Sequence, residues 1–208
     1  MKKRIGVMGS AQGPTLHNQK NINQAIELGH HIAESDCILV SGACPGLPDE
    51  AAFGAPKNGG FVMGISPAFS EREHIDLYHS PTEYYDIILY TGLGLMERDI
   101  INIRSVDAIV IVGGGIGTLN EFTIAYDEGK VVGILEESGG ISDHIGEILK
   151  MCNREMNERI VTDQNPQELV KKVLEAIGQF PNPVTEDDRI TGMNLHAHLP
   201  GKHIVCQA

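Results

Sequence analysis

The segment Val112–Phe122, VGGGIGTLNEF, combines a glycine-rich turn with a carboxylate that follows it closely. Gly114, Gly115 and Gly117 allow backbone N–H groups to approach a ligand, and Thr118 adds a hydroxyl. A helix that begins here directs the positive end of its dipole at the same point. The segment therefore predicts a phosphate-binding turn, with Glu121 available nearby as an acid or base.

Two other interpretations of this segment are open at the level of sequence. Thr118 and Glu121 stand three residues apart, which is the spacing of a T-x-x-E capping box without a chemical role. Gly113 and Gly115 match the start of a G-x-G-x-x-G dinucleotide turn, with Glu136 at the end of the next strand. The dinucleotide interpretation is the weaker of the two because Thr118 stands where the third glycine belongs.

Two more glycine-rich turns, MGSAQG and SGACPG, follow the first two apolar runs of the chain. The candidate nucleotide-pocket residues in and after these turns are Gly9, Ser10, Gly42, Gly46 and Asp49. The Ser10 hydroxyl is either a phosphate or ribose ligand or a plain turn serine. The Asp49 carboxylate either caps its helix or contacts a ribose hydroxyl.

Arg98 and Asn102 stand four residues apart in the segment before the glycine turn, and they share one face of a predicted helix. The planar guanidinium of Arg98 can bind a carboxylate or a phosphate through two N–H groups. A surface salt bridge for Arg98 and a solvated helix face for Asn102 are the alternatives. The same helix is expected to point Leu95, Ile100 and Ile103 inward.

These residues are positioned by short apolar runs that alternate with helical patterns. Continuous apolar strands between helices indicate a parallel sheet that is covered on both faces. The predicted fold class is α/β, a Rossmann-like doubly wound parallel sheet in a three-layer αβα sandwich, with ligands at the carboxyl ends of the strands. Residues 70–82 are expected to be a loop with a short strand, and residues 141–152 a helix. Residues 1–180 form the predicted domain, and 181–208 an extended C-terminal tail.

The composition disfavours two classes of protein, those that bind nucleic acid and those that span a membrane. The 208 residues carry a formal net charge of -12, which disfavours binding to nucleic acid. No apolar run is long enough to span a membrane, and four scattered cysteines without a secretory signal indicate reduced thiols in the cytoplasm. His196, His198, His203 and Cys206 match no metal-binding spacing, so neither a metal nor a cofactor is predicted. His30 and His31 are expected to interact with a helix dipole.

The motifs together resemble one family. GGGIGTLNE resembles the P-G-G-x-G-T-x-x-E motif of the LOG-type proteins, and MERDIINIRS resembles their M-x-x-R-K segment, with Arg98 in the arginine position. The VMGS and SGACPGLPDEAAFGA segments resemble the first two glycine turns of the family. The similarity runs in order from about residue 3 to residue 180. The chain is thereby identified as a divergent member of the SLOG, Rossmann-like superfamily. Members were long labelled lysine decarboxylases, but no lysine here has a recognisable pyridoxal-phosphate setting.

The resemblance implies a homodimer that binds a nucleoside 5′-monophosphate such as AMP. It implies phosphoribohydrolase activity, which cuts the N-glycosidic bond and releases the base and ribose 5-phosphate. Arg98 and Glu121 would be the catalytic pair. The residues that would hold the phosphate are Gly114, Gly115, Gly117 and Thr118.

The chain departs from the family pattern near the implied site. Gly113 replaces the motif proline, Asp99 replaces a lysine, and Asn120 replaces a glutamate. The second turn reads Gly42-Ala43-Cys44 where the family has three glycines. These changes resemble divergent branches of the superfamily that bind nucleotide derivatives without known hydrolysis. A non-hydrolytic sensor or carrier is therefore the alternative function.

Overall fold

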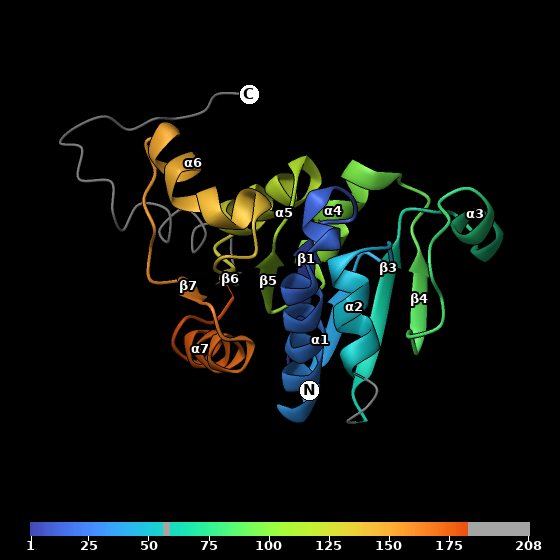
Figure 1. Ribbon diagram of the computed structural model, residues 1–208, viewed down its shortest axis with the longest axis horizontal. Coiled ribbons are helices and arrows are strands. Elements are labelled where there is room, and N and C mark those ends of the chain that lie inside the picture. The colour runs from blue at the N-terminus through green and yellow to red at the C-terminus, as the bar shows by residue number, and fades with distance from the viewer. Residues whose placement is uncertain (56–58, 183–208) are drawn as a thin grey trace.

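The computed structural model describes residues 1–55 and 59–182 (Figure 1). Seven parallel strands form one sheet in the order β4-β3-β2-β1-β5-β6-β7. The strands are β1 (Arg4–Gly9), β2 (Ile38–Ser41), β3 (Phe61–Ser66), β4 (Ile87–Tyr90), β5 (Ala108–Val112), β6 (Val131–Leu135) and β7 (Ile160–Asp163). The α-helices are α1 (Gln19–Glu34), α2 (Leu47–Gly54), α3 (Glu71–Asp76), α4 (Leu95–Arg104), α5 (Ile116–Asp127), α6 (Ile145–Met151) and α7 (Pro166–Gln179). Within residues 1–55 and 59–182 the order also includes the 3-10 helices η1 (Pro14–His17) and η3 (Gly140–His144).

Alternate residues of each central strand enter opposite halves of the core. In β5, Val110 and Val112 pack with α1, α2 and α7, whereas Ile109 and Ile111 pack with α4, α5 and α6. Every residue of β5 is buried. The predicted three-layer sandwich is thus confirmed, and the continuous apolar runs follow from burial of both sheet faces.

The sheet topology brings the glycine turns together. β1 lies in the middle of the sheet, between β2 and β5, and the chain winds outward from it in both directions. Gly9 at the end of β1 pairs with Val112 at the end of β5, so the turns after these two strands are neighbours. A crevice at this switch point is where doubly wound sheets bind their ligands.

Two local expectations were wrong. A short helix, α3, stands where a short strand was expected, because Ser70 caps its first turn by accepting a hydrogen bond from the Glu73 amide at 3.2 Å. The expected helix over 141–152 is divided, since η3 covers its start and α6 begins only at Ile145.

The orientation of α4 also differs from expectation. Leu95 and Ile100 are 52% and 41% exposed, and of the three predicted inward residues Ile103 alone is buried. The buried face of α4 instead carries Arg98, Asp99 and Asn102. A buried face this polar is unusual for a helix on a sheet, because buried charged side chains need partners.

The described residues end shortly after α7. The predicted tail lies outside them from residue 183 onward, and so do its three histidines and Cys206. The domain boundary at residue 180 therefore stays a prediction. Among the described residues, none of the helices combines the length and the apolar character needed to cross a membrane.

Candidate functional site

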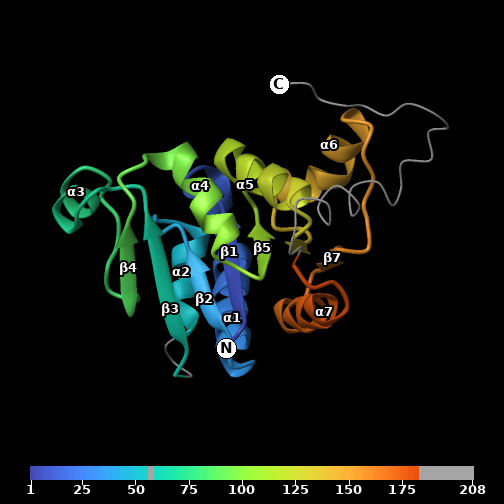
Figure 2. The same cartoon turned by 180° about the vertical axis from the view of Figure 1, so that it is seen from behind.

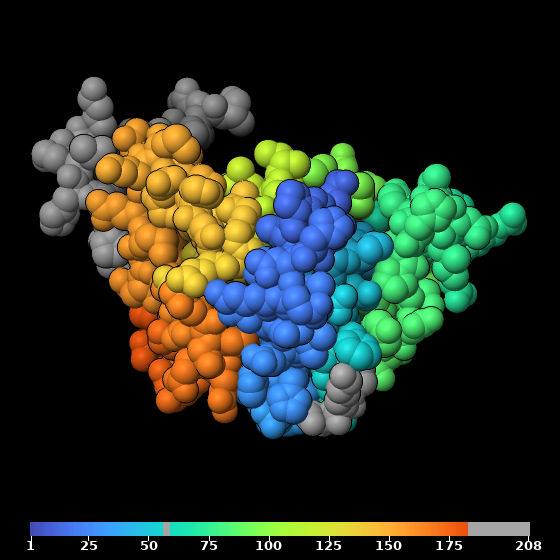
Figure 3. Space-filling model, viewed as in Figure 1, coloured from blue at the N-terminus to red at the C-terminus, as the bar shows by residue number. Residues whose placement is uncertain are grey.

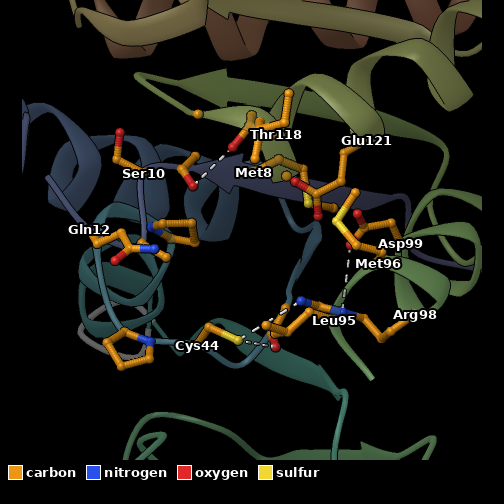
Figure 4. Close-up of a pocket in the computed structure, with 18 of the residues that line it drawn as sticks. Met8, Ser10, Gln12, Cys44, Leu95, Met96, Arg98, Asp99, Thr118 and Glu121 are labelled. Carbon is orange, nitrogen blue, oxygen red and sulfur yellow. Dashed lines mark hydrogen bonds and ion pairs between the residues drawn. The ribbon is translucent and has the colours of Figure 1, made fainter. Parts of the chain in front are cut away.

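A cavity of about 290 Å³ opens at the carboxyl ends of β1, β2 and β5 (Figure 4). Its wall is formed by the turns after these strands and by the first turns of α4 and α5. The residues of the wall are Val7, Met8, Gly9, Ser10, Ala11, Gln12, Gly42, Cys44, Pro45, Pro48, Leu95, Met96, Arg98, Asp99, Gly115, Ile116, Gly117, Thr118 and Glu121.

The start of α5 shows that the capping-box interpretation is wrong. The helix begins at Ile116 after Gly115, and no side chain caps it. The Thr118 hydroxyl donates instead to the Gly9 carbonyl at 3.1 Å, which ties α5 to the end of β1. Glu121 lies inside the helix rather than at its cap. The sequence has the spacing of a capping box, but the threonine hydroxyl bonds to β1 instead of capping the helix.

Two hydroxyl groups hold the glycine turn in shape. The amides of Gly113 and Gly114 donate to Ser138 Oγ at 2.8 Å and to Ser10 Oγ at 2.7 Å. Gly114 has a φ of 102°, a conformation that glycine adopts readily, and it stands outside the cavity wall. The N–H groups in the first turn of a helix have no partner inside the helix. In α5 this leaves the amides of Ile116, Gly117 and Thr118 for a ligand.

The Arg98 side chain is 6% exposed, which contradicts a surface salt bridge. Its Nη1 donates to the Ile65 carbonyl at 3.1 Å, and its Nη2 lies 3.9 Å from Cys44 Sγ. Its Nε has no hydrogen-bond partner within the described chain and lies 3.7 Å from Asp99 Oδ1. A β-carbon at Gly42 would collide with this guanidinium, so glycine at that position makes room for it.

The Glu121 carboxylate is 8% exposed and accepts a hydrogen bond from Asn102 Nδ2 at 3.1 Å. Burial, and then the negative charge of Asp99, raise the pKa of Glu121 to about 7 from its ordinary 4.5. Arg98 and Asn102 oppose this rise. Among the described residues, no hydrogen bond or ion pair joins Arg98 to Glu121. Asn102 is therefore the group that fixes this carboxyl.

Asp99 adds a second buried carboxyl to the site. It is 3% exposed, and it accepts a hydrogen bond from Asn120 Nδ2 at 2.8 Å. Burial raises its pKa, while this hydrogen bond and Arg98 act in the opposite direction. The two departures from the family pattern, Asp99 and Asn120, therefore contact one another directly.

The structure brings most of the predicted site residues into one wall. Those in the wall are Gly9, Ser10, Gly42, Arg98, Gly115, Gly117, Thr118 and Glu121. Those outside it are Gly46, Asp49, Asn102 and Gly114. Gly46 precedes α2 as its N-cap. The Asp49 carboxylate accepts a hydrogen bond from the Tyr85 hydroxyl at 3.3 Å, and burial raises its pKa to about 6.

Several wall residues are not among the site residues predicted from the sequence, among them Met8, Gln12, Cys44, Met96 and Asp99. Figure 4 shows these side chains around the same opening. Asp99 had a usable signal, because it follows Arg98 directly in the sequence and an arginine that becomes buried is usually paired with an acidic group. Burial raises the pKa of the Cys44 thiol, so this cysteine presents a neutral sulfur to the cavity.

Comparison with known proteins places this geometry in a family. The model of the SLOG cluster4 family matches residues 2–170. An uncharacterized protein from Archaeoglobus fulgidus is 34% identical over 133 residues, which are 64% of this chain and 80% of that protein. The molybdenum cofactor binding protein from Rippkaea orientalis is 27% identical, with a TM-score of 0.68 over 85% of this chain and 98% of that one. A Moco carrier protein from Chlamydomonas reinhardtii is 27% identical, with a TM-score of 0.70 over 86% and 99%.

Proposed function

The chain belongs to the SLOG cluster4 family, and from this membership we propose that it binds a phosphorylated nucleotide derivative and holds it without cleaving it. The ligand class is a phosphomonoester that carries a heterocycle. The observation that carries the proposal is the uncapped start of α5 in the wall of the cavity, opposite a buried arginine. A helix start of this kind is a ready anion site.

In this proposal the phosphate binds at the first turn of α5. The amides of Ile116, Gly117 and Thr118 donate to it, and the helix dipole adds to the attraction. Gly115 and Gly117 leave open space around the turn, because a β-carbon at either position would have no protein atom within 4 Å. The organic part of the ligand occupies the remaining cavity, beside Arg98 and the sulfur atoms of the wall.

The similarity to two proteins whose names specify the molybdenum cofactor supports a carrier role. That cofactor is a phosphorylated pterin, and AMP is a phosphorylated purine nucleoside, so both belong to the proposed ligand class. In a carrier the cofactor is cargo. The cavity would hold its phosphate on α5 and its ring system against the β2–α2 turn.

The charge around Glu121 favours holding the ligand over cleaving it. Cleavage of an N-glycosidic bond develops positive charge on the ribose, which an ionised carboxylate stabilises. Asp99 stands where the LOG-type proteins have a lysine, and its negative charge raises the pKa of Glu121, whereas a lysine would lower it. The replacement thus favours the neutral form of Glu121.

Hydrolysis of the N-glycosidic bond is the second candidate, favoured by one observation. Glu121 is a buried carboxyl in the wall, and a pKa of about 7 suits a group that exchanges protons at neutral pH. Incubation of the full chain with AMP, followed by chromatography for free adenine, separates the two functions. Binding without adenine release supports the carrier. Adenine release that Glu121→Gln abolishes would establish the hydrolase.

Gly117→Asp tests the phosphate site directly. We expect it to weaken AMP binding about a hundredfold by calorimetric titration, because it places a negative charge beside the amides that receive the phosphate. The fold should remain intact, since an acidic residue in the first turn of a helix stabilises it. Gly146→Asp, at the same distance from the start of α6 and with equally open surroundings, is the matched control. Unchanged AMP affinity in Gly117→Asp would contradict the site.

We also propose that the chain acts as a homodimer through the face that α4 leaves uncovered. Figure 2 shows no described helix in front of β3 and β4. Ile87 and Leu89 of β4 are 44% and 43% exposed, and Ile100 and Ile101 of α4 are 41% and 37% exposed. Exposed aliphatic side chains that gather on one face of a molecule are typical of an interface. Leu89→Lys should therefore yield a monomer in light scattering, and a monomeric wild-type chain would oppose the proposal.

A further inference from the structure

The last turn of α1 carries two adjacent histidines and a glutamate whose side chains converge. His30 Nε2 lies 3.3 Å from Glu34 Oε1, and His31 Nδ1 lies 2.9 Å from Glu34 Oε2. The two imidazole rings meet edge to face with their centroids 5.1 Å apart. One ligand atom from each of the three residues lies within 4.8 Å of the others. Two ring nitrogens and a carboxylate thus lie within 4.8 Å of one another, and none of the three residues belongs to the wall of the cavity described above.

We propose that His30, His31 and Glu34 form a binding site for a divalent transition metal, with Zn²⁺ as the ion that the donor set fits. Zn²⁺ binds imidazole nitrogen and carboxylate oxygen at about 2.0–2.2 Å. Two such bonds at a tetrahedral angle separate the donor atoms by about 3.4 Å. The observed nitrogen-to-oxygen distances are near this value, but they run to the two different oxygens of Glu34, so the side chains would have to turn until all three donors face one ion.

The donor set also selects among metals. Two imidazoles with one carboxylate suit Zn²⁺, Ni²⁺ and Cu²⁺, whereas Mg²⁺ and Ca²⁺ prefer sites made of oxygen alone. The site lies at the carboxyl end of α1, where the helix dipole attracts a cation. Three protein ligands leave at least one coordination position open. A further ligand, such as a water molecule or another side chain, would therefore complete the coordination of the ion.

A surface cavity beside the three residues gives access to that open position. The cavity, of about 460 Å³, lies between α1 and α7 and includes His31 and Glu34. From α7 it includes Glu168 and Glu175 together with Lys171, whose Nζ lies 3.7 Å from Glu168 Oε2. Figure 3 shows the α1 surface in blue against the α7 surface in orange.

The simpler explanation is a pair of ordinary histidine–glutamate ion pairs, and the chain offers a control for it. His144 Nδ1 lies 2.9 Å from Glu147 Oε2 with the same i, i+3 spacing as His31 and Glu34. That pair has a single imidazole and belongs to no described group of three ligands. If one histidine–glutamate pair sufficed, both places would bind Zn²⁺ equally.

The test is calorimetric titration of the full chain with ZnCl₂. We expect His31→Gln and Glu34→Gln each to bind one Zn²⁺ equivalent fewer than the wild type, and His144→Gln to bind as many as the wild type. Zn²⁺ should also raise the melting temperature less in the first two variants than in the control. Histidines beyond residue 182 contribute equally to every variant, so the difference reports this site. Equal numbers of equivalents in the wild type, His31→Gln and Glu34→Gln would overturn the proposal.

Discussion

Replacement of Glu121 by glutamine is expected to stabilise the protein by about 3 kcal/mol at pH 8 and to change its stability little at pH 4. In the folded chain the pKa of Glu121 is about 7, against an ordinary value of 4.5. Below pH 4.5 the carboxyl is neutral in both the folded and the unfolded states. As the pH rises toward 7, only the unfolded state ionises freely, so the folded state loses relative stability. Glutamine stays neutral at every pH, so the variant does not lose stability as the pH rises.

The local contacts make glutamine a suitable replacement. Asn102 Nδ2 can still donate to the side-chain oxygen at position 121, as it does to Glu121 Oε1 at 3.1 Å. Asn102 Oδ1 has no partner among the described residues and is available to the new amide. Chemical denaturation at the two pH values measures the effect. Glu27→Gln, at an exposed position of α1, is the control and should follow the wild type at both pH values.

Asp99→Asn separates the two causes of the raised pKa. Burial of Glu121 is the larger cause and stays, whereas the repulsion from Asp99 is removed. The pKa of Glu121 should therefore fall but remain above 4.5, which carbon-13 NMR of the carboxyl group can follow. A stability difference between Glu121→Gln and the wild type that does not grow with pH would contradict this account of the site.

Gly29→Ala is expected to destabilise the protein by about 3 kcal/mol, because it forces α1 and α2 apart. A β-carbon at Gly29 would collide with the carbonyl oxygen of Ala51, and one at Gly54 would collide with that of Ile26. The two helices thus approach each other through glycines on both sides. The obstructing atoms are backbone, so no side-chain rotation can relieve the clash. Urea unfolding, with stability taken from the midpoint and slope, measures the loss.

Gly178→Ala is the matched control for Gly29→Ala. Gly178 also lies in a helix, α7, but a β-carbon there would meet no protein atom within 4 Å. Alanine at this position should therefore raise stability by up to about 1 kcal/mol through helix propensity alone. If both variants changed stability by the same amount, the close approach of α1 and α2 would not be what excludes alanine at position 29.

The sequence by itself determined the fold class and the edge of the sheet at which the candidate site lies. A strand buried on both faces needs an unbroken apolar run, so DAIVIVGGG revealed β5 without knowledge of its neighbours. Parallel strands bring their carboxyl ends to one edge, so three glycine-rich turns had to meet there. These conclusions depend on local patterns, which the order of residues contains directly.

Only the tertiary structure decided the roles of single side chains. Thr118 and Glu121 have the spacing of a capping box. In the structure the Thr118 hydroxyl donates to the Gly9 carbonyl, and the Glu121 carboxylate accepts a hydrogen bond from Asn102. The apolar spacing of α4 predicted an inward Ile100, yet the face with Arg98 turns to the sheet. Each of these outcomes depends on a partner distant in sequence. A polar side chain with several available partners binds the one that the fold places beside it, and local spacing carries no information about that choice.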